Sequence, residues 1–373
     1  MLKRFLIIIL IALSACFSSS SIKNQDFEKK YWQAFYNNNN KIILLSDEIK
    51  DFNYKLFKNN KSLVDFYNLP KYIRKNKSKK FAAVIHKSNL RRYPSNEPKF
   101  EDKDDTHFDK HQYKELKLGE PVILLRTLGS WALISTYNVQ GWVEIKNIAF
   151  FESYLQFLKY LDEENFVVVS EPLIKVKEEV LDMGVKLALI KEEKDFVVVK
   201  FPKKSDKGDL IYKKVKLPKS QIHIGYLAYT KRNLIRQAFK YLGTPYGWGG
   251  LYNGVDCSGF VLNVYSVFGF KFPRNSFQQQ NLNNSAIIIS SRAKLNEVFD
   301  NKKAGSLVFF PGHIMIYLGK RGGKHYIIHA VASVFDKRKN KENVMRVVVT
   351  DTNIIRKTGR PYKDEIASLT VVR

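Results

Sequence analysis

The chain has 373 residues, of which 45% are hydrophobic, and this length and composition predict roughly two to four domains with buried cores. The formal net charge is +27, but the lysines are spread along the whole chain and do not form one basic patch. This diffuse excess fits anionic polymers or lipid headgroups as well as it fits a merely lysine-rich composition, and it argues against a nucleic-acid groove.

The first 16 residues, MLKRFLIIILIALSAC, have the order of an export signal. Two basic residues precede an apolar run from Phe5 to Leu13, which is too short to span a bilayer. The ending LSAC resembles a bacterial lipoprotein signal and predicts a lipid on Cys16; a plain secretory signal that ends in cysteine is the alternative. Phe17 follows Cys16 in place of the aspartate that often retains lipoproteins at an inner membrane. We therefore expect the lipid to hold the protein on the periplasmic face of an outer membrane, if the cell has one. Export also argues against nucleic acid as a partner.

Residues 17–80 begin with a serine-rich stretch that is typical of a flexible tether. Short amphipathic patterns follow, in DFEKKYWQAFYNN and SDEIKDFNYKLFKN. We expect a small helical region here and assign no chemistry to it.

Residues 81–150 change to short strands. AAVIH, PVILLRTLG, WALISTY and GWVEIKNIAF alternate apolar and polar residues between turns, as in a small barrel. The Gly119-Glu120-Pro121 turn and the Gly141-Trp142-Val143 strand resemble a bacterial SH3 domain. Residues 151–228 repeat this texture and predict a second, more divergent SH3-like barrel. Its strands carry many lysines, and we expect these to block edge-to-edge pairing.

A polar insertion, EDKDDTHFDKHQ, interrupts the first strand-rich region. His107 and His111 flank Asp109 in it, which raises the question of a metal site. The insertion offers no cysteine and no strand to fix the ligand geometry. We therefore expect solvated side chains and no metal.

The stretch GTPYGWGGLYNGVDCSG, from Gly243 to Gly259, places Cys257 between two helical patterns. The first pattern ends at Gly243, and the second has apolar residues at Phe260, Val261, Val264, Tyr265 and Phe268. Cys257 therefore falls in the first turn of a buried helix, where the helix dipole and free amides favour a thiolate and can bind an oxyanion. The chain has two cysteines, so a lipid on Cys16 would leave Cys257 without a disulfide partner.

A thiol nucleophile needs a base, and histidines follow in two predicted strands. In GHIMIYLG, alternation places His313, Met315 and Tyr317 on one face. In HYIIHA, His329 ends a short apolar strand, whereas His325 follows the RGGK turn and should be exposed. We therefore prefer His329 as the group that orients the base, which completes the logic of a triad.

The strings PYGWGG and DCSGF, the PR-x-S of residues 273–276, GHIMIYLG and IIHA together resemble the NlpC/p60 family of papain-like cell-wall endopeptidases. The resemblance covers roughly residues 231–372. It implies an α+β papain-like domain in which Cys257 is the nucleophile, His313 the base and His329 the orienting residue. The sequence departs from the family at Gly305-Ser306, where Gly-Asp is usual, so a turn-stabilising carboxylate is missing.

The same resemblance suggests further site residues. Tyr246 takes the position whose hydroxyl lies beside the nucleophile and can assist the oxyanion. Asp256 and Ser258 either cap the helix or contact the end of a stem peptide. Arg274 and Ser276 either cap a loop or bind substrate, since arginine binds carboxylates through two hydrogen bonds. We expect the ring of Trp248 to lie in the core.

These observations predict five segments: a signal (1–16), a tether with a helical region (17–80), two SH3-like domains (81–150 and 151–228) and a peptidase domain (229–373). The resemblance to the NlpC/p60 family implies cleavage of peptidoglycan or free murein peptides between D-glutamate and a diamino acid. We expect no cofactor and no metal. The N-terminal signal predicts that a lipid on Cys16 holds the protein on a membrane. Two alternatives stay open. One is a non-catalytic wall-binding lipoprotein, against which the complete Cys-His-His set argues; the other is an amidase or acyltransferase that uses the same residues.

Overall fold

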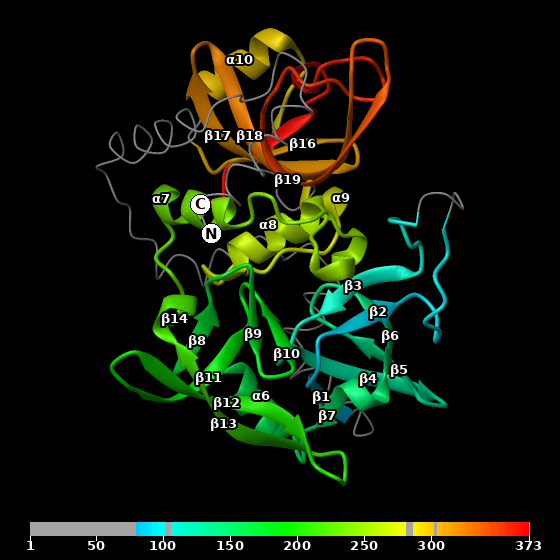
Figure 1. Ribbon diagram of the computed structural model, residues 1–373, viewed down its shortest axis with the longest axis vertical. Coiled ribbons are helices and arrows are strands. Elements are labelled where there is room, and N and C mark those ends of the chain that lie inside the picture. The colour runs from blue at the N-terminus through cyan, green and yellow to red at the C-terminus, as the bar shows by residue number, and fades with distance from the viewer. Residues whose placement is uncertain (1–79, 101–105, 281–285, 302–303, 373) are drawn as a thin grey trace, which may run out of the picture.

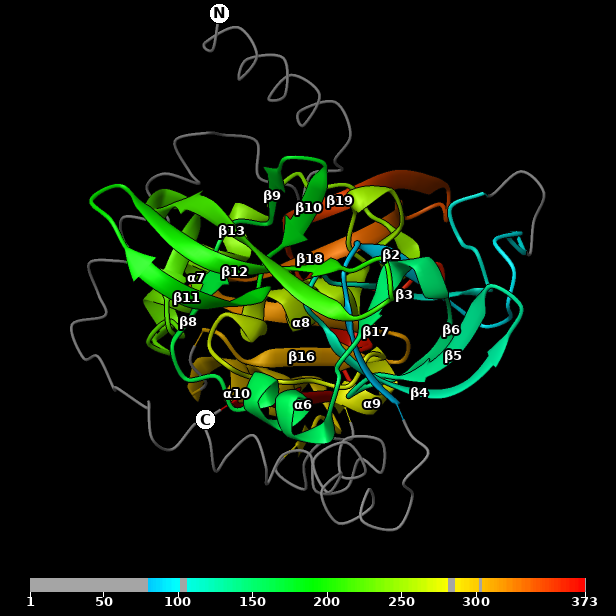
Figure 2. The same cartoon turned by 90° about the horizontal axis from the view of Figure 1, so that it is seen from below.

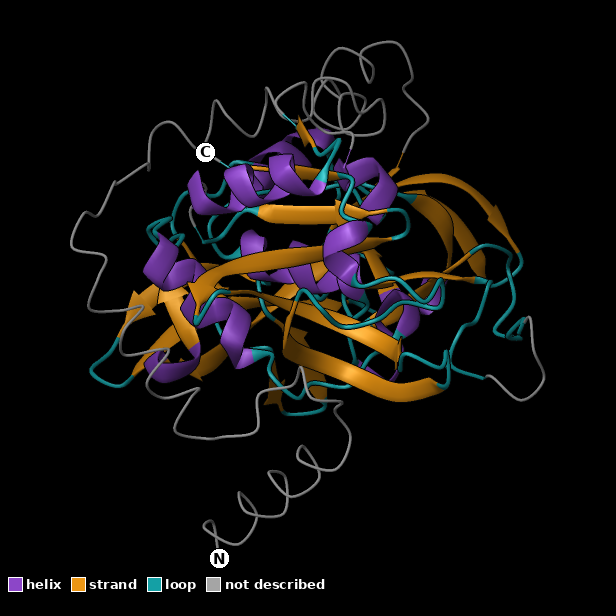
Figure 3. Cartoon of the chain, turned by 90° about the horizontal axis from the view of Figure 1, so that it is seen from above, coloured by secondary structure: helices purple, strands orange, loops and turns teal. Residues whose placement is uncertain are grey.

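The computed structural model describes residues 80–100, 106–280, 286–301 and 304–372. Within them the chain has a mixed α+β architecture, in which two strand-rich regions precede a C-terminal region that contains both helices and a sheet (Figure 1; Figure 3). The predicted signal, the lipid-attachment residue Cys16 and the predicted helices of residues 17–79 lie outside the described residues. No described helix has the length and apolar character needed to cross a membrane.

The first strand-rich region is an antiparallel sheet, which we call the N-terminal sheet. Its seven strands lie in the order β3-β2-β6-β5-β4-β1-β7. Alternate residues point inward and form a small core that includes Val84, Leu90, Val122, Ile134 and Val143. The elements are β1 (Lys80–Val84), β2 (Ser88–Arg91), β3 (Gln112–Leu116), β4 (Pro121–Leu128), β5 (Trp131–Ser135), β6 (Gln140–Glu144), the short 3-10 helix η1 (Ile145–Asn147) and β7 (Ile148–Phe150).

The second strand-rich region contains a five-stranded antiparallel sheet, the middle sheet, in the order β13-β12-β11-β8-β14, beside a separate β9-β10 hairpin. Helix α6 (Tyr154–Leu161) precedes it, and Ser153 caps this helix by accepting from the Gln156 amide. Phe157 of α6 is buried against Phe81 of β1, which ties the two regions together. The other elements are β8 (Phe166–Val169), β9 (Leu173–Val176), β10 (Glu179–Asp182), β11 (Lys186–Glu192), β12 (Phe196–Lys204), β13 (Leu210–Pro218), η2 (Lys219–Gln221) and β14 (Ile222–Ile224).

The C-terminal region is built on a six-stranded sheet in the order β15-β20-β16-β17-β18-β19. Helix α8 lies between this sheet and the two strand-rich regions, and α10 lies on the opposite face (Figure 1). The elements are α7 (Lys231–Lys240), η3 (Trp248–Asn253), α8 (Cys257–Ser266), α9 (Ser276–Gln280), β15 (Ile287–Ile288), α10 (Arg292–Asn301), β16 (Leu307–Phe310), β17 (His313–Arg321), β18 (Lys324–Phe335), β19 (Lys341–Asp351), η4 (Tyr362–Asp364) and β20 (Ser368–Thr370).

The alternation in β17 decides which side chains face α8. Ile314 and Ile316 belong to the same buried cluster as Phe260 and Val264 of α8, whereas Met315 and Tyr317 pack with the cluster on the α10 side. The predicted division of this strand into two faces is therefore confirmed. Each fully buried apolar side chain in these clusters contributes about 1.5–3 kcal/mol relative to exposure, so the sheet and α8 form one stable unit.

The predicted helices on either side of the cysteine are also confirmed. The first ends at Lys240, and Gly243 takes the left-handed conformation at φ 84° that a helix end often needs. The second begins at Cys257. The prediction that His329 ends a short strand is wrong, because β18 continues to Phe335. A register shift between Val331 and Ser333 accommodates the small, polar residues there while pairing with β19 continues.

The middle region packs tightly against α8. Gly184 lies in the turn between β10 and β11 with φ 84°, and a Cβ atom built on it would lie 1.7 Å from Ser266 Oγ. Nearby, the Lys117 ammonium donates to the Met183 carbonyl at 2.7 Å, so the N-terminal region joins the same contact. Seen from below, the two strand-rich regions lie side by side beneath the C-terminal region (Figure 2).

We predict that Gly184→Ala destabilises the protein more than Gly208→Ala does. Both glycines have a left-handed φ, at 84° and 92°, but the Cβ atom at 208 would meet only the end of the Lys204 side chain, at 3.9 Å. The two substitutions therefore share the strain of the left-handed backbone, and Gly184→Ala adds a clash that we expect to cost roughly a further 1–3 kcal/mol. Urea unfolding checks this, and equal losses of unfolding free energy would contradict the close packing of Gly184 on α8.

Candidate active site

Helix α8 begins at Cys257 because the carboxylate of Asp256 caps it. One oxygen accepts from the Gly259 amide at 2.8 Å, and the other accepts from the Gly249 amide at 2.9 Å. Gly249 can reach this position because it takes a left-handed conformation at φ 63°, where its missing Cβ would otherwise strike the Gln112 side chain. The cap therefore ties the glycine-rich turn to the start of the helix.

The Arg274 guanidinium completes this arrangement. It contacts both Asp256 oxygens, at 2.5 and 3.1 Å, and donates to Ser258 Oγ at 2.8 Å. Burial would raise the pKa of Asp256, but Arg274 and the two backbone amides outweigh it and hold that pKa below its usual range. Gln279, which sequence reasoning missed, donates to the Pro273 carbonyl at 2.7 Å and fixes the loop that carries Arg274. Ser276 is partly buried at the start of α9.

The Cys257 thiol is buried, with 8% of the residue exposed. Burial and then the Asp256 carboxylate raise its pKa to about 12, against the lowering effects of the Ile314 amide, the Arg274 cation and the Ser258 amide. The Ser258 amide at the helix N-terminus acts in the expected direction, because it lowers the thiol pKa, but burial and the Asp256 carboxylate outweigh it. The contact with the Ile314 amide also places the thiol against the beginning of β17, next to His313.

His313 and His329 form a hydrogen-bonded pair across β17 and β18. His313 Nε2 lies 2.8 Å from His329 Nδ1, and His329 Nε2 lies 3.2 Å from Thr350 Oγ1. Burial lowers the pKa of His313 to about 3, with a smaller effect of Arg356, and burial and His313 lower the pKa of His329 well below its usual range. Both imidazoles are neutral at pH 7, and the pair engages Nε2 of His313, which leaves Nδ1 for another partner.

His325 is not exposed, in contrast to the prediction. Only 9% of the residue is accessible, and its Nδ1 lies 2.8 Å from the Tyr317 hydroxyl. Its ring packs on Phe299 of α10, with centroids 4.7 Å apart. The strand that carries both histidines thus places His329 against His313 and His325 against α10.

Tyr246 lies close to the thiol. Burial and then the charge of Cys257 raise its pKa well above the usual value, so the hydroxyl stays protonated and able to donate. The ring of Phe108, from the polar insertion, lies 5.8 Å from the Tyr246 ring and 5.6 Å from the Trp248 ring, measured between centroids. Trp248 is 38% exposed, so its predicted place in the core is wrong, because it packs on this loop at the surface.

Asp109, in the described part of the insertion, is less exposed than expected. Asp109 was predicted to be solvated, yet it is 3% exposed and pairs with the Arg91 guanidinium at 2.5 Å. Its other oxygen accepts from the amides of Lys99 and His111, both at 2.9 Å. This carboxylate thus organises the loop that presents Phe108.

Tyr362 also lies at the site, although no sequence motif predicted it. It follows β19, is 3% exposed, and packs edge-on against His329 and His313 with centroids 5.7 and 6.2 Å apart. Burial raises its pKa, with a smaller contribution from the charge of Cys257. Tyr362 therefore forms an apolar wall beside the two histidines.

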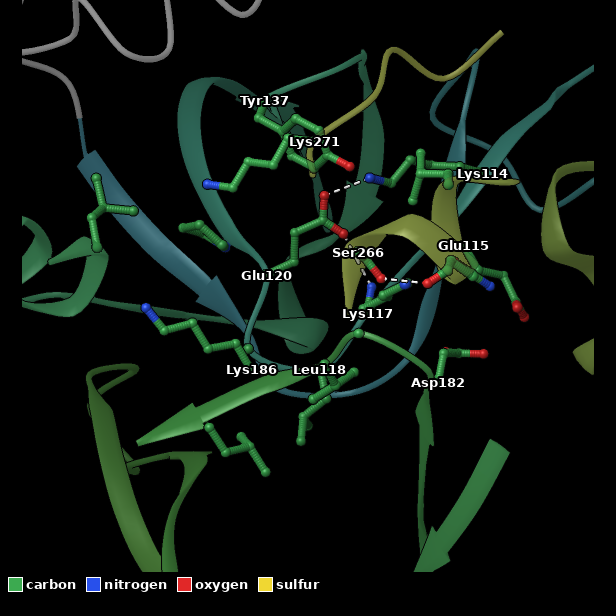
Figure 4. A pocket seen from close by; sticks show the side chains of 18 of the residues that line it. Lys114, Glu115, Lys117, Leu118, Glu120, Tyr137, Asp182, Lys186, Ser266 and Lys271 are labelled. Atoms are coloured by element: carbon green, nitrogen blue, oxygen red, sulfur yellow. Dashed lines mark hydrogen bonds and ion pairs between the residues drawn. The ribbon is translucent and has the colours of Figure 1, made fainter. Parts of the chain in front are cut away.

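A cavity of about 650 Å³ lies where the three regions meet (Figure 4). Asp256 and Arg274 line it, but Cys257, His313 and His329 do not. The buried ammonium of Lys114 pairs with Glu120 at 2.5 Å, and burial lowers the pKa of Lys117 to about 8. The cavity follows one side of α8 from Gly259 to Ser266, and the lining residues Lys114 and Lys117 donate to protein groups.

Residues 243–351, which contain Cys257, His313, His329 and Thr350, match the model of the NlpC/P60 family. The C-terminal region belongs to the NlpC/P60 family. Residues 97–144 match an SH3 domain model of the SH3b1 type, so an SH3b-like region precedes the NlpC/P60 domain.

Two curated relatives resemble the NlpC/P60 domain. Dipeptidyl-peptidase 6 of Lysinibacillus sphaericus is 33% identical over 98 residues, which cover 24% of this chain and 30% of that protein. Gamma-D-glutamyl-L-lysine dipeptidyl-peptidase of Bacillus subtilis (strain 168) is 32% identical over 104 residues, which cover 26% and 31% of the two chains. This chain thus spans less than a third of the length of these relatives.

The fold as a whole resembles that of a solved structure, an NlpC/P60 endopeptidase from Photobacterium damselae subsp. piscicida. The TM-score is 0.67 at 17% sequence identity, and the match covers 95% of this chain and 94% of the other. At this identity the likeness concerns the fold, including the arrangement of the strand-rich regions ahead of the NlpC/P60 domain.

We predict that Cys257 is a neutral thiol at pH 7 in the free protein. Since its pKa lies above the ordinary thiol value, thiolate absorbance near 240 nm should appear only as the pH rises into the strongly alkaline range. The difference spectrum between the wild type and Cys257→Ser isolates this thiol, because both proteins retain Cys16. A thiolate signal already present at pH 6 would contradict the prediction.

Proposed function

We propose that this protein is a cysteine endopeptidase that cleaves peptidoglycan stem peptides at the bond between D-γ-glutamate and an L-diamino acid. The observation that carries the proposal is the pair of His313 and His329, in which Nε2 of the first lies 2.8 Å from Nδ1 of the second. His313 begins β17, and the amide of the next residue, Ile314, contacts the Cys257 thiol. The name of the Bacillus subtilis relative supports the choice of the γ-D-glutamyl bond.

The reaction begins with a proton transfer. Cys257 Sγ attacks the γ-carbonyl carbon while its proton moves to His313 Nδ1, the nitrogen that His329 leaves free. The carbonyl oxygen becomes an oxyanion, which the amides at the start of α8 and the protonated Tyr246 hydroxyl can stabilise. Since thiol and imidazole are both neutral at rest, attack and proton transfer are coupled.

The second half of the reaction releases both products. The C–N bond breaks, His313 gives its proton to the departing amine of the diamino acid, and a thioester remains on Cys257. Water then attacks the thioester, with His313 accepting a proton and returning it to sulfur. The peptide leaves as a carboxylate, and the enzyme is restored.

The polar residues around the thiol divide into two groups. Asp256 accepts hydrogen bonds from Arg274, Ser258 and two backbone amides, and these contacts favour a role in holding α8 over recognition of a peptide ammonium group. The same contacts favour a supporting role for Arg274 and Ser258. Tyr246, which lies beside the thiol, and the partly buried Ser276 remain our candidates for direct contact with substrate.

The strand-rich regions shape access to the site in this proposal. We assign two SH3-like domains, at residues 81–150 and 151–228, ahead of a peptidase domain at 229–373. Phe108 rests on Tyr246 and Trp248, and Gln112 donates to the Gly249 carbonyl at 3.3 Å. A loop fixed in this way closes one end of the site and restricts the substrate to trimmed, unbranched peptides.

We also propose that the protein acts in the cell envelope, anchored by a lipid on Cys16. The signal-like sequence MLKRFLIIILIALSAC supports this anchor. An outer membrane is favoured if the cell has one, because aspartate does not follow the cysteine.

We predict that the purified protein releases peptides cut after D-γ-glutamate from a digest of peptidoglycan, as measured by mass analysis. Cys257→Ala should lower the rate of cleavage by several orders of magnitude, because the nucleophile is lost. His329→Asn should keep partial activity, because an amide can still hydrogen-bond to His313. Cleavage at another bond would favour an amidase or acyltransferase, and binding without cleavage would favour a wall-binding protein.

We predict that a radioactive or clickable fatty acid labels the wild type and not Cys16→Ala. The reason is that lipid transfer needs the thiol at the end of the signal. Cys257→Ala is the matched control, since it removes the other cysteine and should leave labelling unchanged. Equal labelling of wild type and Cys16→Ala would refute the anchor.

A further inference from the structure

Three polar side chains lie in a diagonal row across the apolar sheet of the C-terminal region. His313 belongs to β17, His329 to β18 and Thr350 to β19. His329 pairs with Val348 in the ladder between β18 and β19, so Thr350 lies two residues along on the same face. Strand register alone therefore brings the hydroxyl to His329.

The row is closed to water at its inner end. His329 and Thr350 both have no accessible surface. Among the described residues, the hydrogen bond recorded for the Thr350 hydroxyl is the one to His329 Nε2, at 3.2 Å. The hydroxyl can accept a proton from His329 Nε2 or donate one to it, depending on the tautomer of His329. Where His329 carries its proton on Nε2, the hydroxyl oxygen is the acceptor without which this buried donor would be costly.

The position of that proton controls His313. If His329 carries its proton on Nε2, its Nδ1 accepts from the His313 Nε2 proton, and His313 Nδ1 keeps a lone pair. If His329 carries the proton on Nδ1, it donates to His313 Nε2. His313 then holds its own proton on Nδ1 and cannot accept another there. After it has taken the thiol proton, His313 must donate from Nε2, which again requires the first arrangement.

We propose that Thr350 is a positioning residue whose hydroxyl oxygen accepts the His329 Nε2 proton, so that His329 stays in the tautomer that makes His313 Nδ1 a proton acceptor. This inference rests on the proposed thiol chemistry of Cys257 and His313. It adds a fourth residue, outside the recognised motifs, that acts through His329 and touches no substrate.

The test compares Thr350→Val with Thr370→Val in the full-length chain. Valine keeps the shape of threonine and removes the hydroxyl. Thr370 is a matched control because it is buried in β20 of the same sheet and its hydroxyl has no hydrogen-bond partner within the described part of the chain. A second pair, Thr350→Ser and Thr350→Ala, differs by the hydroxyl alone and serves if valine at 350 prevents folding.

The first readout does not depend on a peptide substrate. The rate at which iodoacetamide alkylates Cys257 is followed by mass analysis of the peptide that contains it, and ¹⁵N NMR of labelled histidines reports which ring nitrogen is protonated. We expect Thr350→Val and Thr350→Ala to slow alkylation at pH 7 by about tenfold or more, since the base is lost. The NMR signals should show the His329 proton moving from Nε2 to Nδ1. Thr350→Ser and Thr370→Val should match the wild type.

The second readout is cleavage of the stem peptide. We expect Thr350→Val to lower kcat with little change in KM, because the residue acts on proton transfer and not on binding. Unchanged tautomers and alkylation in both Thr350→Val and Thr350→Ala would overturn the inference, even if the wild type cleaves the peptide. If the wild type cleaves no stem peptide while the hydroxyl still controls tautomer and alkylation, the proposed function fails and the inference stands.

Discussion

The carboxylate of Asp256 is the interaction on which the site depends. It joins three separate pieces of chain: the glycine-rich turn through the Gly249 amide, the first turn of α8 through Gly259, and the loop after α8 through Arg274. A buried carboxylate is stable only when it is paired and hydrogen-bonded, and here both oxygens are. Removing Arg274 would leave that charge unpaired at the start of α8. The position of Cys257 is therefore set by an ion pair that lies directly beside it.

Burial gives the site its chemical character. The thiol and the two imidazoles lie in surroundings that disfavour charge, so the pKa of Cys257 is raised and the pKa values of His313 and His329 are lowered. A preformed thiolate and imidazolium would need compensation, and the neighbouring Asp256 carboxylate opposes the thiolate. The structure instead favours a neutral pair that transfers its proton during attack. In such a site the tautomers of the histidines matter as much as their distances.

Much of this site could be predicted from sequence because its signals are local. The glycines around residue 250, the apolar spacing after Cys257 and the alternation in β17 each specify a helix end, a buried helix or a strand face. The residues that sequence reasoning missed, Thr350, Tyr362 and Gln279, act through strand register and loop paths, which a linear pattern does not encode. The errors have the same origin. His325 and Trp248 were placed from their neighbours in sequence, whereas their burial is decided by α10 and by Phe108 from a distant insertion.

The central claim is that Cys257 forms a covalent thioester with the γ-glutamyl half of a stem peptide. Rapid acid quenching of the protein with L-alanyl-γ-D-glutamyl-L-lysine, followed by mass analysis of the proteolytic fragments, tests it most directly. The account predicts that the L-alanyl-γ-D-glutamyl group is found on the fragment that contains Cys257, and that Cys257→Ala neither carries it nor cleaves the peptide. Cleavage by Cys257→Ala, or an adduct on another residue, would contradict the account.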